Sequence, residues 1–216
     1  MPSDIFIFGL GNPGIEYKYT RHNFGFIAVD YFAELNSFPN FVHKKNYAIS
    51  SKTFSDSIAD KKNVYLIRPL TFMNLSGTAV NDVLKKHNVF CFKNGIKENG
   101  NRSTDDVPLV VVIHDDLDLN FGRIKIKFGG SGGSHNGVIS IINSLRSKEF
   151  LRLKLGTNSA MRNKFKTGAD YVLGRFSKDE IQQLPDILNM LSDILTSLIG
   201  DGLTKTTNKF NSVLKG

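Results

Sequence analysis

The sequence predicts a single-domain α/β sandwich in which a central mixed β-sheet is flanked by helices, with one domain over residues 1–216. Two observations lead to this fold class. Apolar runs of strand length alternate with segments whose apolar residues recur at the helical period. In addition, 216 residues with 40% hydrophobic content are enough to close one core. We expect no membrane-spanning segment, because no apolar run approaches the roughly 20 residues that one needs.

The first part of the chain predicts a strand, a helix and two more strands. Residues 5–10 form a nearly continuous apolar run followed by a glycine turn, which is typical of a buried strand. Apolar residues at the helical period then predict a helix over residues 24–35, with Asn23 as its N-cap. Further strands are expected at residues 47–51 and 64–67.

The middle of the chain continues this alternation. A helix capped by Asn74 or Ser76 is expected to reach about Lys86, and a buried strand is expected at residues 109–113. Residues 93–107 are polar, rich in glycine and asparagine and without periodicity, which predicts an exposed loop insertion. Two basic strands with a short helix between them follow, at residues 123–128, 138–145 and 151–155.

The last long helix has a clear start signal. Ser177 and Glu180 form a capping box before a run of apolar residues at the helical period. Pro185 lies inside this run, and we expect it to kink the helix.

The positive charge is concentrated in one region of the chain. Lysine and arginine total 28 against 20 aspartates and glutamates, which gives a net charge of +8 and a pI of about 9.5. The whole excess lies between residues 121 and 176, where eleven basic residues accompany only two acidic ones. This distribution favours a polyanionic partner such as a nucleic acid.

Both strands in this basic region alternate basic and apolar residues. On a strand, alternation places Arg123, Lys125 and Lys127 on one face. Arg152 and Lys154 repeat the pattern in the second strand. If the two strands are neighbours, the five cations form a platform spaced for successive RNA phosphates. Taken singly, each strand is more typical of an ordinary half-buried strand with a solvated outer face.

A glycine-rich turn follows the first strand. Residues 9–14, Gly-Leu-Gly-Asn-Pro-Gly, match the G-x-G-x-x-G pattern of dinucleotide-binding sites. However, Pro13 removes an N–H donor that such a site needs, and no acid follows at a strand end about 20 residues later. A tight turn that presents Asn12 at the carboxyl end of a strand fits better, since open α/β sheets bind ligands at that edge.

An acidic motif is predicted at the same edge of the sheet. Residues 114–118, His-Asp-Asp-Leu-Asp, directly follow the expected strand at 109–113. Three interpretations remain open from spacing alone. The acids bind a divalent cation, or one carboxylate orients a histidine held elsewhere in the chain, or the segment is a surface turn.

Among the five histidines, His22 is the strongest candidate for a catalytic base. It precedes the first helix and lies close in sequence to the Asn12 turn, so it can reach the same edge. The sequence has no G-x-S-x-G motif, and its single cysteine, Cys91, adjoins the polar insertion. Water activated by a histidine is therefore simpler chemistry than a serine or cysteine nucleophile.

Taken together, these segments resemble the bacterial-type peptidyl-tRNA hydrolase family. The matching motifs occur in the family's order along nearly the whole chain. They are residues 9–14 with Tyr17, 20–23, 71–77, 114–118, 132–137 and 201–205. The resemblance implies a monomeric enzyme, without metal or organic cofactor, that hydrolyses the ester between a peptide and the 3′-terminal ribose of tRNA.

The resemblance also implies roles for individual residues. His22 is the general base, and Asp115 holds its imidazole and stabilises the charged form. Asn12, Asn74 and Asn136 match positions that hold the peptide and the 3′ adenosine and help to polarise the ester carbonyl. The residues matching the cleft lining are Tyr17 and Met73, and those matching the tRNA phosphate grip are Lys127 and Lys154.

The sequence departs from the family pattern at several positions. Lys154 stands where bacterial members commonly have arginine, which exchanges a bidentate fork for a point charge and predicts weaker phosphate selection. Asp116 replaces the usual glutamate, and Ser134 a common glycine. The segment 93–107 is longer than the bacterial connection, which suggests a eukaryotic or otherwise divergent member.

Two rival functions remain. One is a metal-dependent phosphoesterase that uses Asp115, Asp116 and Asp118, although no downstream acidic cluster supports it. The other is a non-catalytic RNA-binding relative on the same fold, against which the presence of His22, Asp115 and Asn12 argues. The first residues show no basic leader, and a lone cysteine fits a reducing compartment, so we expect a cytoplasmic protein, with the mitochondrial matrix as the alternative.

Overall fold

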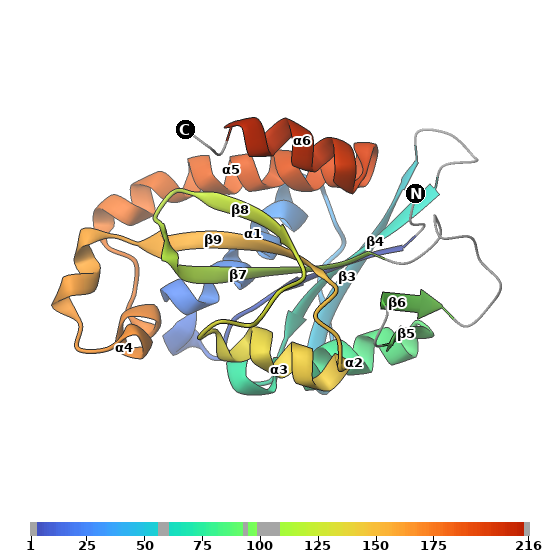
Figure 1. Cartoon of the computed structure of the whole chain (residues 1–216), viewed down its shortest axis with the longest axis horizontal. Coiled ribbons are helices and arrows are strands. Elements are labelled where there is room, and N and C mark those ends of the chain that lie inside the picture. Colours follow the sequence, from blue (N-terminus) through green and yellow to red (C-terminus); the bar gives the residue numbers. More distant parts are fainter. Residues whose placement is uncertain (1–3, 56–60, 93–94, 99–108, 214–216) are drawn as a thin grey trace.

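The structure is a computed structural model that describes residues 4–55, 61–92, 95–98 and 109–213. Its centre is a seven-stranded mixed sheet in the order β2-β3-β4-β1-β7-β9-β8, with helices on both faces (Figure 1). The predicted α/β sandwich with a central mixed sheet is therefore confirmed. Within the described ranges, no helix combines the length and the apolar character needed to cross a membrane.

The strands of the main sheet are β1 (Asp4–Gly9), β2 (Val42–His43), β3 (Tyr47–Ser55), β4 (Lys61–Pro69), β7 (Leu109–Asn120), β8 (Ile124–Phe128) and β9 (Leu151–Asn158). A separate antiparallel pair consists of β5 (Val89–Phe92) and β6 (Gly95–Glu98). The helices are α1 (Phe24–Leu35), α2 (Ser76–Lys86), α3 (Asn136–Leu145), α4 (Gly168–Leu173), α5 (Lys178–Asp201) and α6 (Leu203–Val213). Short 3-10 turns precede several of them, at η1 (Ile15–Tyr17), η2 (Arg21–Asn23) and η3 (Met73–Leu75), and η5 (Ala160–Lys164) follows β9.

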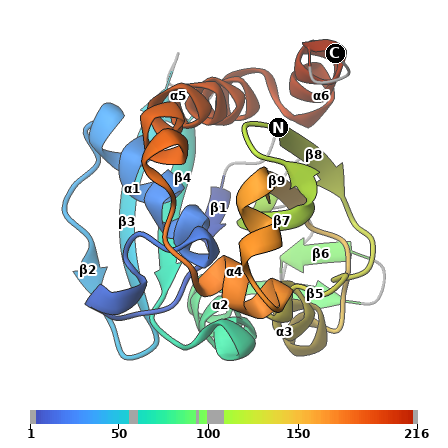
Figure 2. The same cartoon turned by 90° about the vertical axis from the view of Figure 1, so that its left-hand side faces the viewer.

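The four central strands run in the same direction. β1 is parallel to β4 and β7, and β7 is parallel to β9, so the carboxyl ends of all four meet at one edge. Successive side chains of β1 point to opposite faces of the sheet, so the strand contributes to two hydrophobic cores. Ile5 and Ile7 pack with α1 and α5 on one face, and Phe6 and Phe8 pack with α2 and α3 on the other. Figure 2 shows these helices on opposite sides of the twisted sheet.

Several predicted elements need correction. The strand expected to stop at residue 113 continues as β7 to Asn120, so the acidic motif lies in the strand and not beyond it. Asn23 occupies the N-cap position of α1 as predicted, but its side chain makes no capping hydrogen bond, and neither Asn74 nor Ser76 caps α2 through its side chain. Part of the expected loop at 93–107 is a strand, β6, and the rest of that segment lies outside the described residues.

The start of α5 follows the prediction. The side chain of Ser177 accepts from the backbone N–H of Glu180, whose carboxylate accepts from the backbone N–H of Ser177. Pro185 lies inside α5, which continues to Asp201.

Two glycines bring α1 directly against the end of β1. A Cβ added at Gly25 would lie 2.3 Å from the backbone nitrogen of Leu10 and 2.4 Å from the carbonyl oxygen of Ile113. Gly9 faces this contact from the strand, since its added Cβ would meet the Gly25 carbonyl oxygen at 2.2 Å. The turn that precedes α1 is thereby held over the carboxyl ends of β1 and β7, where it carries His22.

We expect Gly25→Ala to lower the free energy of unfolding by about 1–3 kcal/mol, because backbone atoms must move to admit the methyl group. Gly200→Ala on α5 is the matched control, since a Cβ there meets nothing within 4 Å and alanine favours the helix. Urea unfolding of both variants checks this. Equal stability of the two variants would contradict the tight contact.

Candidate active site

A cavity of about 820 Å³ opens at the carboxyl edge of the central strands. It lies over β1 and β7 and extends towards β9 and β8. Its lining includes most of the predicted site residues, namely Asn12, His22, Met73, Asn74, Asp115, Lys127, Asn136, Arg152 and Lys154. Segments far apart in the sequence therefore meet at the edge where the motifs were expected.

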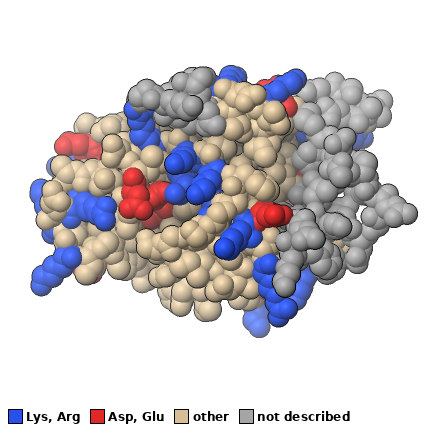
Figure 3. Space-filling model, viewed as in Figure 1, with Lys and Arg blue, Asp and Glu red and all other residues tan. Residues whose placement is uncertain are grey.

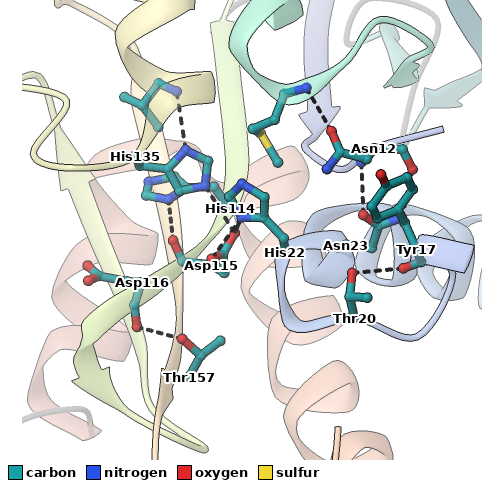
Figure 4. Close-up of polar contacts among 12 residues, drawn as sticks. Asn12, Tyr17, Thr20, His22, Asn23, His114, Asp115, Asp116, His135 and Thr157 are labelled. Carbon is teal, nitrogen blue, oxygen red and sulfur yellow. Dashed lines mark hydrogen bonds and ion pairs between the residues drawn. The ribbon is translucent and has the colours of Figure 1, made fainter. Parts of the chain in front are cut away.

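The predicted histidine and carboxylate are in direct contact. His22 lies in the turn η2, and its Nδ1 is 3.0 Å from Oδ1 of Asp115 on β7 (Figure 4). Because a carboxylate accepts, Nδ1–H of His22 donates, and Nε2 is left to take a proton. Of the three interpretations of the acidic motif, the structure supports a carboxylate that orients a histidine.

A second histidine binds the same carboxylate. Nε2 of His135 lies 3.0 Å from Oδ1 of Asp115, and Nδ1 of His135 accepts from the backbone N–H of Val138. This pattern assigns the proton of His135 to Nε2, which donates to Asp115. Sequence reasoning did not select His135. The available signal was its place between the glycine loop and α3.

Burial and charge set the protonation of this cluster. Burial by itself lowers the pKa of His22, but the charge and the hydrogen bond of Asp115 outweigh it and raise that pKa above 6.5. Burial would raise the pKa of Asp115, but the two histidines hold it well below its usual range. His114 behaves differently, because burial and the nearby His135 lower its pKa to about 3. Its ring therefore stays neutral and donates from Nδ1 to the Asp115 carbonyl oxygen.

Asn12 faces this pair from the end of β1 and is held in one orientation. Its backbone N–H donates to Oδ1 of Asn23, and Nδ2 of Asn23 donates to its carbonyl oxygen. The backbone N–H of Met73 donates to Oδ1 of Asn12, which leaves the Nδ2 end of this amide as a donor. Asn23, taken from the sequence as a helix cap, is thus a positioning residue for Asn12.

The remaining residues predicted to bind substrate do not all line the cavity. Asn74 and Asn136 are exposed and line the cavity, whereas Met73 is buried at its base. Tyr17 is not part of the cavity lining, and Figure 4 shows it on the Asn12 side of the opening. The structure therefore brings the three asparagines and Met73 to the cavity and leaves Tyr17 at its margin.

A buried ion pair anchors the turn that carries His22. The side chain of Arg21 is fully buried, and its Nη2 lies 2.6 Å from Oε2 of Glu180, the capping-box residue of α5. Its Nη1 donates to the carbonyl oxygens of Tyr171 and Gly174, so α4 is tied to the same turn. The guanidinium also stacks on the Tyr171 ring, with its carbon 4.2 Å from the ring centroid.

Removing one partner of this pair should be costly. We expect Arg21→Gln to lower the free energy of unfolding by roughly 3–5 kcal/mol, because Glu180 would remain buried without its counter-charge. Arg68→Gln is the control, since the Arg68–Asp30 pair is partly exposed and should contribute less than about 1 kcal/mol. Similar losses for the two variants in chemical unfolding would contradict the anchoring role of Arg21.

The basic platform forms in part. β8 and β9 are antiparallel neighbours, with Lys125 opposite Lys154 and Lys127 opposite Arg152. Lys125 and Lys127 on β8, and Arg123 just before it, are exposed, as alternation predicted. Figure 3 shows cationic side chains gathered near the centre of this face, with acidic side chains beside them.

The platform members on β9, Arg152 and Lys154, bind partners within the protein. Arg152 is only 2% exposed, and its two Nη atoms donate to the carbonyl oxygens of Gly130 and Ser131. In this arrangement Arg152 holds the glycine loop, and its contact with a tRNA phosphate stays a prediction. Lys154 forms an ion pair with Asp116, and Lys127 has no ion pair within the described part of the chain.

The carboxylates expected for a metal-dependent phosphoesterase do not converge. Asp115 binds the two histidines, whereas Asp116 pairs with Lys154 and accepts the backbone N–H of Asp118. Among the described residues, the group with ligand atoms within 4.8 Å of one another is His22, Asp115 and His135. A metal there would have to replace two hydrogen bonds to Asp115, so this geometry suits proton transfer better than metal binding.

Comparisons with known proteins show the family of this chain. A family model described as Peptidyl-tRNA hydrolase matches residues 6–215. A peptidyl-tRNA hydrolase of Clostridium acetobutylicum is 36% identical over 211 residues, which cover 96% of this chain and 97% of that protein. One of Bifidobacterium adolescentis is 38% identical over 214 residues, covering 98% of this chain and 99% of its own.

A solved structure gives the same result. The crystal structure of peptidyl-tRNA hydrolase from Acinetobacter baumannii has a TM-score of 0.76 and 26% identity, and the match covers 98% of this chain and 96% of that one. The mixed sheet and the histidine–carboxylate cavity at its edge define an α/β enzyme of the hydrolase class. Within that class, the chain belongs to the peptidyl-tRNA hydrolase family.

Proposed function

We propose that this enzyme hydrolyses the ester that joins a peptide, or an N-blocked aminoacyl group, to the 3′-terminal ribose of peptidyl-tRNA. The reaction returns tRNA from aborted translation. The observation that carries the proposal is the 3.0 Å contact of His22 Nδ1 with Asp115 inside a cavity that also presents asparagine side chains. The family assignment supplies the substrate class.

The geometry supports a mechanism in which water is the nucleophile. Nε2 of His22 takes a proton from water as the water oxygen attacks the ester carbonyl carbon, and Asp115 stabilises the imidazolium that forms. Nδ2 of Asn12 donates to the developing oxyanion, because Oδ1 of this amide is already held by Met73. When the carbon–oxygen bond to the ribose breaks, His22 returns its proton to the 3′ oxygen.

His22 should be required for chemistry and not for folding. We expect His22→Gln to lower the single-turnover rate on N-acetyl-aminoacyl-tRNA by roughly 10²- to 10⁴-fold, the usual contribution of a general base. His87→Gln, a histidine outside the cavity, should keep the wild-type rate. Wild-type cleavage should resist EDTA and spare unblocked aminoacyl-tRNA. An unchanged rate in His22→Gln would refute the role of His22.

The role of Asp115 gives a pH prediction. Because Asp115 raises the pKa of His22 above 6.5, wild-type kcat/KM should rise with pH through that raised pKa as His22 loses its proton, and then level off. In Asp115→Asn the carboxylate charge is gone, so the acid limb should move to lower pH while the plateau falls by roughly 10²- to 10⁴-fold. A profile in which Asp115→Asn lowers the plateau but leaves the acid limb at the wild-type pH would contradict this role.

The cations of the platform should contribute unequally to the binding of tRNA phosphates. Lys127 is free to bind a phosphate, whereas a phosphate that binds Lys154 must first displace Asp116. We therefore expect Lys127→Ala to weaken tRNA binding more than Lys154→Ala does, and to reduce the slope of log K against log salt by about 1. Lys178→Ala, an exposed lysine at the start of α5, is the charge-matched control. Equal losses at Lys127 and Lys178 would indicate only a general effect of charge.

A further inference from the structure

We propose that a second cavity, on the other side of Asn12 from the catalytic cavity, binds the part of the substrate peptide that precedes the ester-linked residue. The inference rests on the proposed function and identifies a binding site for the peptide chain itself. The cavity measures about 620 Å³ and lies between the turn after β1, helix α1, the end of β4 and helix α5.

The two cavities are adjacent because Asn12 lines both of them. Its side chain belongs to the catalytic cavity, where Met73 holds its Oδ1. Its neighbours Pro13 and Gly14 and the paired residue Asn23 line the second cavity. An acyl chain that leaves the ester carbonyl beside Asn12 therefore has the second cavity directly next to it.

The order of the strands separates the two ends of the substrate. The catalytic cavity extends from β1 over β7 towards β9 and β8, which carry the cations proposed for tRNA phosphate. The second cavity extends from β1 the opposite way, because its lining includes Arg68 and Leu70 at the end of β4 and His43 of β2. Figure 2 shows β4 and β2 on the side of β1 away from β9 and β8. In an ester, the acyl and ribose groups leave the carbonyl carbon in different directions. If tRNA occupies the β8–β9 side, the second cavity offers the peptide a path past Asn12 towards β4.

The chemistry of the second cavity suits a peptide and not a polyanion. Its walls include aromatic and aliphatic side chains, among them Phe26, Ile27, Tyr31, Leu70 and Leu188. The lysine and arginine in its lining, Lys18 and Arg68, are balanced by Asp30 and Glu34, and Arg68 is paired with Asp30. The lining of the second cavity therefore has no excess positive charge, in contrast to the β8–β9 face, and does not favour phosphate binding.

Exposed apolar residues lie in the lining of this cavity. Ile15 is 80% exposed and Tyr19 is 51% exposed, although both are large and hydrophobic. Burying such side chains against apolar groups of a ligand is favourable in free energy. A peptide of six residues spans roughly 20 Å when extended, which is enough to pass from the reacting ester into the neighbouring cavity.

The test compares substrates that differ only in peptide length. Stable 3′-amide analogues of tRNA are prepared with an N-acetylated single residue or an N-acetylated apolar hexapeptide, and their Kd values are measured by fluorescence titration. The variant is Ile15→Glu with Tyr19→Glu, both at exposed positions, so that folding is preserved. Ile181→Glu, an exposed isoleucine on α5 that lines neither cavity, is the matched control.

We expect the double variant to weaken binding of the hexapeptide analogue about tenfold or more and to leave the single-residue analogue within about twofold of wild type. Ile181→Glu should change neither. An equal loss of affinity for both analogues would overturn the inference, because Ile15 and Tyr19 would then act through Asn12 and not on the peptide. No change for either analogue would also overturn it.

Hydrolysis of the corresponding esters separates this inference from the proposed function. Wild-type enzyme that binds the hexapeptide analogue more tightly than the short one, but cleaves neither ester, would refute the proposed reaction and leave the peptide site standing. Cleavage of both esters with length-independent KM in wild type and variant would refute the peptide site alone.

Discussion

The site depends on one buried carboxylate that remains charged. Asp115 lies within the core strand β7, where burial opposes ionisation, and it stays ionised because two imidazole N–H groups donate to the same oxygen. In return it fixes one ring tautomer in His22 and another in His135. The identity of the proton-accepting atom, Nε2 of His22, follows from this single interaction.

The rest of the fold serves to deliver the partners of that carboxylate. Parallel strands bring their carboxyl ends to one edge, and the Gly9–Gly25 contact holds the His22 turn over that edge. Arg21 then ties the turn to α4 and α5, which come from the far end of the chain. Catalytic geometry is therefore supported by an ion pair between side chains 159 residues apart in sequence.

Much of this arrangement could be predicted from the sequence, because periodicity and motifs are local signals. The strand and helix order, His22, Asp115 and the Asn12 turn all follow from short segments read by their spacing. What could not be predicted depends on partners that are distant in sequence. Asn23 fits an N-cap locally, yet its side chain binds the backbone of Asn12. Alternation placed Arg152 on the cationic face, but its hydrogen bonds are set by the loop that folds over it.

Arg152 also shows how neighbouring cations on β9 differ in the partners they hold. Its guanidinium reaches two successive carbonyl oxygens at 2.5 Å each, one from each Nη atom of a planar fork. Lys154, two residues along the strand, has one carboxylate as its partner, and a point charge is sufficient for that. The same strand therefore contains one cation that holds a loop through two nitrogens and another that pairs with a carboxylate as a point charge.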